Sequence, residues 1–557
     1  MDEHFMTLNV ALESEELTAI IAYDIWKKPE RLTDMRIRER NPDMAMLDGI
    51  KSAQLWMQRC AEEHKKCPHN QSPSTYPSRL LELRDRTLHL IVPKETEMQG
   101  PYAALSYCWG PNPNFLQLTS SNAQCLGAGI LYTELPIAFQ EAIHIAKALS
   151  IHYIWIDCLC IIQSGPAHTQ DWLTESANMQ AIYANCFINI SLARAANPHQ
   201  TCFEVADHGT VMPFRVDKAR TPADIDKGAT SSLFVPSDYY IKNLYELPLG
   251  HRAWVLQERI MAPRVLSFGR GELFWECTTQ PDASETFPDG LDTDMRYRIR
   301  IRGQDAVESV YDRTLEGMWY DLLDEYTRRR LTNPETDKLI AISAVSMRFE
   351  QAMKDRYISG HFWRMLPVSL LWSTAGSVKR LDNGVPRWSW ASIDGPLEQP
   401  WTVPHCPLAN TFLDTNIAGA EQGGAGGVCL TLQTYCARLE WDAGHHRVAQ
   451  EPGAWKYIHD ARFCWDIPSD ESSRGTQEHV VALIATRTSL ILGLLLQQIQ
   501  TEGRQVYARV GHFSALTDNK ALADAPEMRS SAAYSNDPSE RLHIIAQLQE
   551  KRTLVLM

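Results

Sequence analysis

Three segments of this chain are apolar on both faces, and stretches with helical spacing separate them. They are residues 102–107 (YAALSY), 153–162 (YIWIDCLCII) and 187–193 (FINISLA). Strands buried on both faces are typical of parallel sheets, which helices cover on both sides. The order strand, helix, strand, helix, strand therefore predicts an α/β domain with a doubly wound, mostly parallel sheet, because right-handed crossovers make the successive strands parallel.

Helical patterns precede and connect these strands. In residues 45–64, apolar side chains recur at steps of three and four, which predicts an amphipathic helix. Residues 135–149 and about 171–185 are the predicted helices between the three strands. Residues 80–93 (LLELRDRTLHLIVP) alternate in the manner of a hairpin.

The chain is too long for one domain, since 557 residues exceed what a single hydrophobic core usually holds. Beyond the α/β segment the pattern becomes helical, and the last part alternates as strands do. We therefore expect an N-terminal helical region, the α/β domain, a helical region that closes on this domain, and a β-rich C-terminal region. Their expected boundaries are 1–75, 76–290, 291–400 and 401–557.

The charge balance argues against nucleic acid and anionic membranes as partners. There are 54 Lys and Arg against 68 Asp and Glu, so the net charge is −14. The basic run in MRYRIRIRG (295–303) alternates, which favours one solvated face of a strand. No apolar stretch approaches the roughly 20 residues of a membrane-spanning helix. The acidic N-terminus is unlike a signal peptide, and 13 scattered cysteines suit a reducing compartment, so we expect a soluble, cytoplasmic protein.

Common catalytic signatures are absent from the sequence. It has no GxxxxGK[ST] loop, no GxGxxG after a strand, no GxSxG elbow and no HExxH helix. Their absence argues against a P-loop NTPase, a typical dinucleotide-binding oxidoreductase, an α/β-hydrolase and a zincin.

Three dense segments carry a family resemblance. They are YAALSYCWG (102–110), the pair YIWIDCLCIIQ (153–163) and DWLTESANMQAIYANC (171–186), and HRAWVLQERIMAPRVLSFG (251–269). Together they resemble the three signature blocks of the fungal heterokaryon-incompatibility (HET) domain family. Flanking motifs extend the resemblance over roughly residues 45–400: FWEC (274–277), DKLIAISAV (337–345) and PRWSWAS (386–392). One departure is Ser164, which stands after Gln163 where many members have Asp.

The resemblance implies a cytoplasmic fungal protein of the kind that triggers cell death when incompatible strains fuse. It also implies a TIR-like fold, and some TIR domains cleave NAD with a glutamate. Trp172 and Glu175 loosely resemble the residues around that glutamate, which makes Glu175 the candidate catalytic group. A carboxylate there would stabilise positive charge at the scissile N-glycosidic bond. The alternative is a solvated carboxylate near a helix N-terminus.

Other residues of the three blocks complete the candidate site. Asp157 ends an apolar strand and needs a partner, for which Arg252 and Arg259 are the candidates. Asp157, Arg252 and Glu258 form either an anion or ribose site, in which Asp157 and Glu258 join Glu175 as catalytic candidates, or a structural ion-pair network that fixes the third block to the sheet. The candidate substrate-binding residues are Ser106, Tyr107, Trp109, Gln163, Trp172, Arg252, Trp254 and Gln257. We expect Glu175, Tyr107, Trp109 and Trp254 to converge on one cleft, with Gln257 and Glu258 on its rim.

A separate cluster offers metal ligands. Cys60, His64 and Cys67 follow each other at i, i+4 and i+7, on one helix face. Thiolates and an imidazole at this spacing can hold zinc, with His69 or a distant group as fourth ligand. The alternative is a buried cysteine face that continues the apolar stripe of the helix.

The sequence alone leaves two functions open. The first is a non-self recognition or cell-death protein that acts on a small-molecule ligand or a protein partner, with NAD as a candidate substrate. The second is a free-standing enzyme of the cyclase or isomerase type in a fungal biosynthetic (secondary metabolism) pathway.

Overall fold

The computed structural model describes the parts of the chain that follow. They are residues 6–13, 18–26, 45–68, 73–96, 98–203, 213–217, 231–279, 283–290, 299–302, 306–309, 314–376, 378–398, 416–422, 428–442, 445–448, 458–466, 479–487, 490–501, 504–517 and 551–557. The chain divides into two compact units, Met1–Met295 with Arg300–Arg302, and Arg296–Ile299 with Gly303–Met557. Among the described helices, none has the length and apolar character needed to cross a membrane.

Four parallel strands form the centre of the first unit. They are β5 (Tyr102–Ser106), β7 (Tyr153–Trp155), β8 (Ile188–Ser191) and β11 (Arg264–Phe268), in the spatial order β11-β8-β5-β7. In β5, Ala103 lies opposite both Ile154 of β7 and Ile188 of β8. All five residues of β5 are buried, as the doubly apolar sequence predicted. The prediction of three adjacent parallel strands is confirmed.

Antiparallel strands extend this sheet on both sides. They are β3 (Leu80–Leu83), β4 (Thr87–Ile91) and β6 (Ile130–Leu131) beyond β7, and β12 (Leu273–Cys277) and β13 (Ala283–Ser284) beyond β11. The hairpin predicted before the first parallel strand is therefore present. The expectation of a mostly parallel sheet was wrong, since parallel pairing is confined to the centre. Short turns make the pairs β3–β4, β11–β12 and β12–β13 antiparallel, and β7–β3 and β4–β6 are antiparallel as well.

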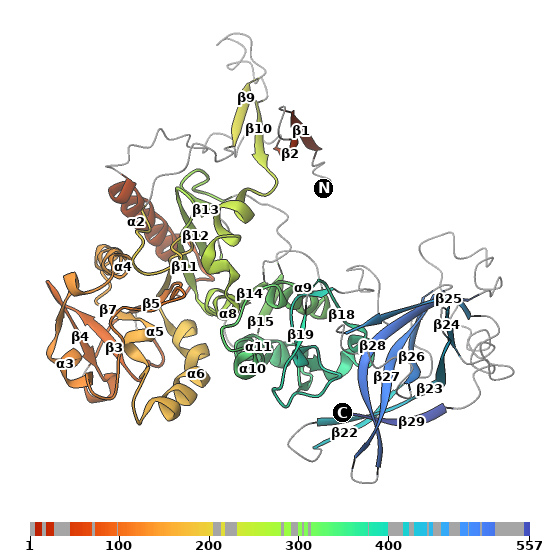
Figure 1. Ribbon diagram of the computed structural model, residues 1–557. Coiled ribbons are helices and arrows are strands. Elements are labelled where there is room, and N and C mark those ends of the chain that lie inside the picture. Colours follow the sequence, from red (N-terminus) through yellow and green to blue (C-terminus); the bar gives the residue numbers. More distant parts are fainter. Residues whose placement is uncertain are drawn as a thin grey trace. The chain divides into compact units, whose positions relative to one another are not determined.

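The order of the parallel strands creates a topological switch point. Numbered along the chain they lie 2-1-3-4, which is the flavodoxin-like doubly wound order. The connection from β5 to β7 contains α4 (Ile137–Ala148), whereas the later connections cross to the other side through α6 (His168–Asn185) and α8 (Ala253–Met261). Figure 1 shows α4 with α2 (Ala45–Glu63) on one side of the sheet and α6 with α8 on the other. The switch point lies at the carboxyl ends of β5 and β8.

The second predicted strand is shorter than its apolar sequence indicated. It ends at Trp155, and Asp157–Cys160 form the helical turn α5. The Asp157 carboxylate accepts the main-chain N–H of Cys158 at 2.6 Å, which stabilises the start of this turn.

The remaining elements of the first unit are short, apart from one small sheet. Four antiparallel strands, in the order β1-β2-β10-β9, form that sheet. Residues 1–75, which we expected to be helical, thus contain β1 and β2 in addition to α2. The elements are β1 (Met6–Glu13), β2 (Thr18–Trp26), β9 (Phe214–Asp217), β10 (Ser231–Pro236), α3 (Ala123–Ala128), η2 (Pro93–Glu95), η3 (Tyr132–Glu134), η4 (Ile241–Tyr245) and η5 (Pro248–His251).

The second unit combines helices with a large antiparallel sheet. Its helices are α9 (Leu315–Thr327), α10 (Pro334–Asp337) and α11 (Ser343–Met353). The large sheet consists of β22 (Asn416–Gln422), β23 (Val428–Asp442), β24 (His445–Val448), β25 (Ile458–Trp465), β26 (His479–Arg487), β27 (Leu490–Thr501), β28 (Arg504–Thr517) and β29 (Lys551–Leu556). A β-rich C-terminal part is confirmed.

Short strands and turns connect these helices to the large sheet. They are β14 (Ile299–Arg302), β15 (Ala306–Ser309), β16 (Tyr357–Ile358), β17 (His361–Phe362), β18 (Ser373–Thr374), β19 (Lys379–Arg380), β20 (Ile393–Asp394), β21 (Leu397–Glu398), η6 (Trp363–Met365), η7 (Val368–Leu371) and η8 (Trp390–Ser392). We expected the middle region to close on the α/β domain. In the structure, Leu370 and Trp388 of this region share an apolar cluster with Leu432 and Leu494 of the large sheet.

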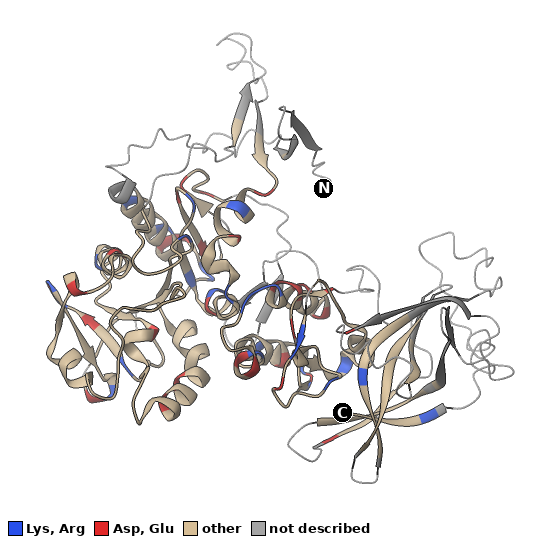
Figure 2. Ribbon diagram, in the orientation of Figure 1, with Lys and Arg blue, Asp and Glu red and all other residues tan. Residues whose placement is uncertain are grey.

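Charged residues are interspersed over the described helices and strands of each unit (Figure 2). Of the basic run in residues 295–303, Ile299–Arg302 form β14, in agreement with the strand pattern, and the residues before it lie outside the described part.

Candidate functional site

Aromatic side chains and a carboxylate meet at the carboxyl ends of β5 and β7. Tyr107 and Trp109 follow β5, and Asp157 follows β7. The Tyr107 hydroxyl donates to Asp157 Oδ1 at 2.6 Å, and Trp109 Nε1 donates to Asp157 Oδ2 at 2.8 Å. The two rings are stacked, with centroids 6.5 Å apart. The structure thus brings these three predicted site residues together.

The predicted arginine partner of Asp157 was wrong. In the described part of the chain, Asp157 pairs with no arginine. Arg252 donates to the main-chain oxygen of Tyr107 instead. Arg259 donates to Glu276 Oε1 at 2.8 Å. The physical reason is that two neutral side-chain donors and the Cys158 N–H already satisfy the Asp157 carboxylate, so it needs no opposite charge.

Glu258 forms a second polar cluster beside the first. The hydroxyl of Ser106 lies within hydrogen-bonding distance of Glu258 Oε2, and it donates to Asn189 Oδ1 at 3.1 Å. A hydroxyl has one hydrogen, so both contacts are satisfied when a protonated Glu258 donates to Ser106 and Ser106 donates to Asn189. Burial raises the pKa of Glu258 to about 7, against the opposing effects of the Ser106 hydrogen bond and the Arg252 charge.

This cluster lies at the switch point of the sheet. Ser106 is the last residue of β5 and pairs in register with Ser191, the last residue of β8. Asn189 belongs to β8, and α8 supplies Glu258. Open α/β sheets bind their ligands at this position, outside the carboxyl ends of the strands that flank the switch.

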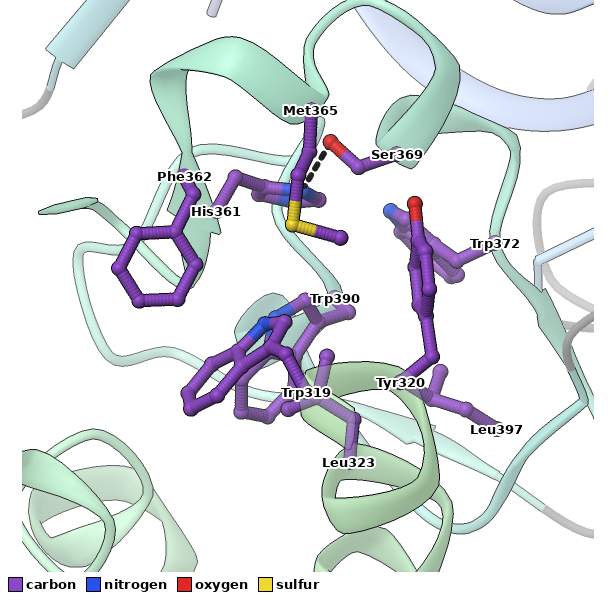
Figure 3. A pocket seen from close by; sticks show the side chains of 10 residues that line it. All are labelled: Trp319, Tyr320, Leu323, His361, Phe362, Met365, Ser369, Trp372, Trp390 and Leu397. Atoms are coloured by element: carbon purple, nitrogen blue, oxygen red, sulfur yellow. Dashed lines mark hydrogen bonds between the residues drawn. The ribbon is translucent and has the colours of Figure 1, made fainter. Parts of the chain in front are cut away.

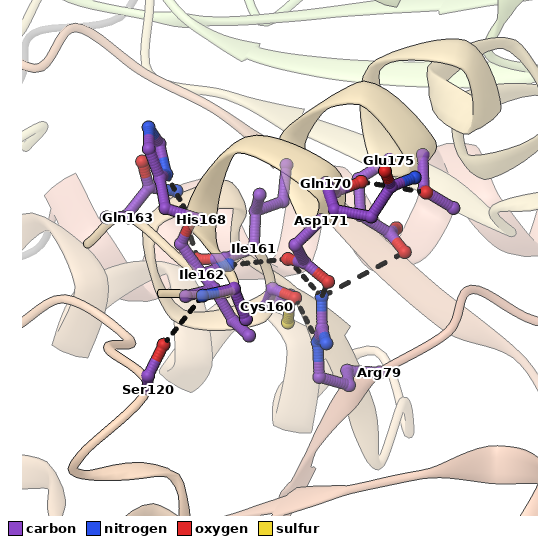
Figure 4. A network of polar contacts seen from close by, with 12 residues as sticks. Arg79, Ser120, Cys160, Ile161, Ile162, Gln163, His168, Gln170, Asp171 and Glu175 are labelled. Atoms are coloured by element: carbon purple, nitrogen blue, oxygen red, sulfur yellow. Dashed lines mark hydrogen bonds and ion pairs between the residues drawn. The ribbon is translucent and has the colours of Figure 1, made fainter. Parts of the chain in front are cut away.

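Glu175 belongs to a different network, which Figure 4 shows. Arg79 Nη2 donates to both carboxylate oxygens of Asp171, at 2.8 and 2.6 Å, and lies 3.9 Å from Glu175 Oε1. Glu175 is only 2% exposed, its Oε2 has no hydrogen-bond partner, and burial raises its pKa. Glu175 is therefore a buried carboxyl rather than a solvated one.

The same network holds the loop before Ser164. The main-chain N–H of Ile162 donates to Asp171 Oδ2 at 2.8 Å. Gln163 donates to the main-chain oxygens of Asp157 and Ile161, at 3.3 and 3.1 Å, and so holds the α5 turn.

The segment that contains both polar clusters is recognisable. Residues 102–258 match the family model described as "Heterokaryon incompatibility protein (HET)". This chain carries a HET domain. The matched segment starts at the first residue of β5 and ends at Glu258. No curated protein and no solved structure matches the chain.

Within the HET domain, the residues expected to converge on one cleft fall into separate groups. Tyr107, Trp109 and Asp157 are in contact, and Ser106 contacts Glu258. Among the described contacts, none links Glu175 to either group. Four of the predicted residues have other surroundings than expected: Gln257 and Glu258 are buried rather than on a rim, and Trp254 and Trp172 are half-buried.

Sequence reasoning missed three residues of these networks. Asn189 stands as a polar residue inside the apolar segment FINISLA, which is the signal that could have identified it. Arg79 precedes β3, and no pattern in the sequence connects it to Asp171. Asp171 itself was recognised only as part of a family motif.

The predicted metal ligands gather beside the HET domain, together with a fourth residue. The ligand atoms of Cys60, His64, Cys67 and Cys277 all lie within 4.8 Å of one another, and all four residues are buried. His69, the other candidate, lies outside the described residues. Cys277 was not predicted, because its position at the end of β12 becomes adjacent to α2 only in the folded sheet.

A small pocket occurs in the second unit, and none of its lining residues is a predicted site residue (Figure 3). Its walls are mainly aromatic, and His361 Nδ1 lies 3.0 Å from Ser369 Oγ within it. The pKa of His361 is lowered to about 3 by burial, so its ring is neutral at physiological pH. Within the part of the chain that the structure describes, His361 Nε2 and the Tyr320 hydroxyl have no hydrogen-bond partner, which suits a bound water better than a larger ligand.

Proposed function

We propose that the HET domain is a hydrolase that cleaves the N-glycosidic bond of NAD, with Glu258 as its acid–base group. The observation that carries this proposal is the buried Glu258 carboxyl, whose pKa is raised to about 7, in contact with Ser106 at the switch point. A carboxyl with this pKa is half ionised near neutral pH, where an acid–base group works best.

The reaction can be written with these residues in stated roles. The C–N bond between the ribose and nicotinamide breaks, and its electron pair goes to the nicotinamide nitrogen, which becomes neutral. A water molecule forms the new bond to the ribose carbon and gives its proton to ionised Glu258, from which the proton passes to solvent. Trp109, half-buried and held by Asp157, offers a ring against which a flat base can stack.

The proposal extends to the biological setting. We infer a cytoplasmic fungal protein that acts in non-self recognition and cell death through a TIR-like domain. The 2-1-3-4 order of the parallel strands supports a TIR-like relationship. The free state of the described cysteines, for example Cys158, Cys160 and Cys186, supports a reducing compartment.

The test is nicotinamide release from NAD by the purified full chain. We expect Glu258→Gln to reduce the rate by at least about 100-fold, the lower end of acid–base contributions. The matched control is Glu246→Gln, which removes a half-exposed carboxylate paired with Lys242 and should leave the rate unchanged. Glu175→Gln distinguishes the two buried carboxyls: loss of activity there with an unchanged rate in Glu258→Gln would transfer the catalytic role to Glu175.

A second candidate function is a cyclase or isomerase acting on a less charged small molecule. The observation in its favour concerns charge. Arg252 is the cation that acts on the Glu258 carboxyl, whereas the two phosphates of NAD would need more positive charge nearby. A hydrogen-bonded chain from Glu258 through Ser106 to Asn189 also suits proton transfer within a substrate. Two results together would favour this function. The wild-type protein would release no nicotinamide from NAD but would convert a pathway intermediate, and the Glu258→Gln variant would lose that conversion.

A further inference from the structure

We propose that Cys60, His64, Cys67 and Cys277 bind a structural zinc ion that fixes helix α2 to strand β12. This inference is independent of the proposed reaction. It concerns residues outside the segment that matches the HET family, since three ligands precede residue 102 and the fourth follows residue 258.

The backbone brings the four ligands together from two distant parts of the chain. Cys60 lies in the last turn of α2, and His64 follows the last residue of this helix, Glu63, so the three ligands do not share one helix face as expected. Cys67 follows in a turn in which its N–H donates to the His64 carbonyl at 3.0 Å. Cys277 is the last residue of β12, and its Sγ lies 3.3 Å from His64 Nδ1.

The spacing of the ligand atoms fits a tetrahedral site. With zinc–sulfur bonds of about 2.3 Å and a zinc–nitrogen bond of about 2.0–2.1 Å, ligand atoms lie about 3.5–3.8 Å apart. The four atoms are already within 4.8 Å of one another, so small rotations of the side chains close the site. A Cys₃His set is a standard structural zinc site, and thiolates with an imidazole select zinc over magnesium or calcium.

The closed, buried character of the cluster indicates a structural ion. Cys60 and Cys67 are 0% and 2% exposed, and Cys277 and His64 are 6% and 9% exposed. Catalytic zinc sites have three protein ligands and keep a position for water or substrate, whereas here four protein ligands fill the coordination sphere.

Arg264 provides an independent observation, because it supplies the charge that such a site needs. Three thiolates, a neutral imidazole and Zn²⁺ carry a net charge of −1, which one buried cation would balance. Arg264 is 2% exposed, and its Nε donates to Cys60 Sγ at 3.3 Å. Among the described residues it forms no ion pair with a carboxylate; its other partners are the main-chain oxygens of Pro68 and Phe187 and the Phe187 ring.

Contacts around the cluster show what the ion would hold in place. Trp56 of α2 stacks on Trp275 of β12 with ring centroids 6.3 Å apart, and Trp56 Nε1 donates to the Pro288 carbonyl at 3.1 Å. Thr279 Oγ1 lies 3.4 Å from Cys67 Sγ, where it can orient that sulfur. The ion would thus lock one end of a helix whose middle already packs on the same strand.

Metal analysis of the full chain tests the proposal. The protein is purified in reducing buffer without chelator and its metal content measured by mass spectrometry. We expect about one zinc ion per chain, retained through gel filtration. Cys277→Ser should lower the content to less than about a tenth, whereas Cys186→Ser, which alters a buried cysteine outside the cluster, should retain it.

Cobalt binding by the wild-type protein keeps the test valid if Cys277→Ser fails to fold. Co²⁺ added to metal-free wild type should produce the visible bands of tetrahedral cobalt and thiolate-to-cobalt charge transfer, and zinc should abolish both. Wild-type protein that contains no zinc after purification, takes up none from solution and gives no such bands would overturn the proposal.

Discussion

The hydroxyl of Tyr107 donates a 2.6 Å hydrogen bond to the carboxylate of Asp157, 50 residues further along the chain. The contact joins the loop after β5 to the start of α5, at the carboxyl edge of two neighbouring parallel strands. Tyr107 is buried, and burial beside Asp157 raises its pKa well above the ordinary range, so the phenol remains a donor over the whole physiological pH range.

Replacing Asp157 by Ala should destabilise the first unit. The change leaves the Tyr107 hydroxyl, the Trp109 indole N–H and the Cys158 main-chain N–H without their acceptor. We expect a loss of about 2–4 kcal/mol in the free energy of unfolding, because unsatisfied buried donors cost about 1–3 kcal/mol each and Trp109 is half-buried. Urea unfolding followed by fluorescence measures it. Asp85→Asn, at an exposed position, should change stability by less than about 0.5 kcal/mol; an equal effect of both substitutions would contradict the prediction.

The pH dependence of stability should report the burial of Glu258. Its pKa is raised from 4.5 to about 7 by burial, so the folded state binds the proton more tightly than the unfolded state. The contribution of Glu258 to stability is therefore fully present below about pH 4.5 and is lost as the pH rises to about 7, by about 3 kcal/mol. Glu258→Gln should remove most of this slope, leaving the smaller contribution of Glu175, whose pKa is also raised by burial. Unfolding midpoints measured from pH 5 to 8 check this, and an unaltered slope in Glu258→Gln would count against it.

Removal of the Arg264 charge should weaken zinc binding. Arg264→Met keeps much of the side-chain volume but removes the donor to Cys60 and the balancing cation. We expect zinc affinity to fall by about 10–100-fold, as for other groups that hydrogen-bond metal ligands. Competition with a chromophoric chelator measures the affinity. Arg59→Met provides a control, since Arg59 lies on the same helix and pairs with Asp289 at the surface; equal affinities of the Arg264→Met variant and wild type would contradict the role assigned to Arg264.

In the second unit, replacing one partner of a buried ion pair should lower stability, whereas replacing both partners should lower it much less. Arg509 Nη1 donates to both Asp466 oxygens at 2.6 and 2.7 Å, and the side chains are 0% and 1% exposed. Arg509→Met leaves a buried carboxylate and should cost about 3 kcal/mol, near the lower end for such pairs because Arg380 lies 3.6 Å from Asp466. Adding Asp466→Leu should restore most of the loss. Hydrogen exchange along β28 measures both, and a double variant less stable than Arg509→Met would argue against this account.

The sequence predicted elements whose pattern is local. The three central strands are apolar on both faces, and α2 shows a helical stripe, so each could be identified without knowing its neighbours. The α5 turn could not be identified this way, since its residues Cys158, Leu159 and Cys160 are as apolar as the strand before them. Only the acidic residue at its start distinguishes it, and we took Asp157 as the end of the strand.

The sequence did not predict contacts between residues that lie far apart along the chain and that only the fold brings together. Cys277 lies 213 residues from His64, and no pattern in either segment points to the other. The family motif identified Glu258 as a candidate. Its burial depends on β5 and β8 being neighbours, and the order of the strands in the sheet determines that. For the same reason, the arginines expected at Asp157 are engaged by Tyr107 and Glu276 instead.

The strand order also limits how far the first unit can be trimmed. A protein trimmed to the recognisable residues 102–258 would lose β11, the partner of β8, and β3, the partner of β7. Both strands would then present bare, apolar edges, which are templates for aggregation. The Cys60, His64, Cys67 and Cys277 side chains would be lost as well. An expression fragment that starts before α2 and ends after β13 keeps every strand neighbour of this sheet, so the segment by which the family is recognised is narrower than the unit that folds.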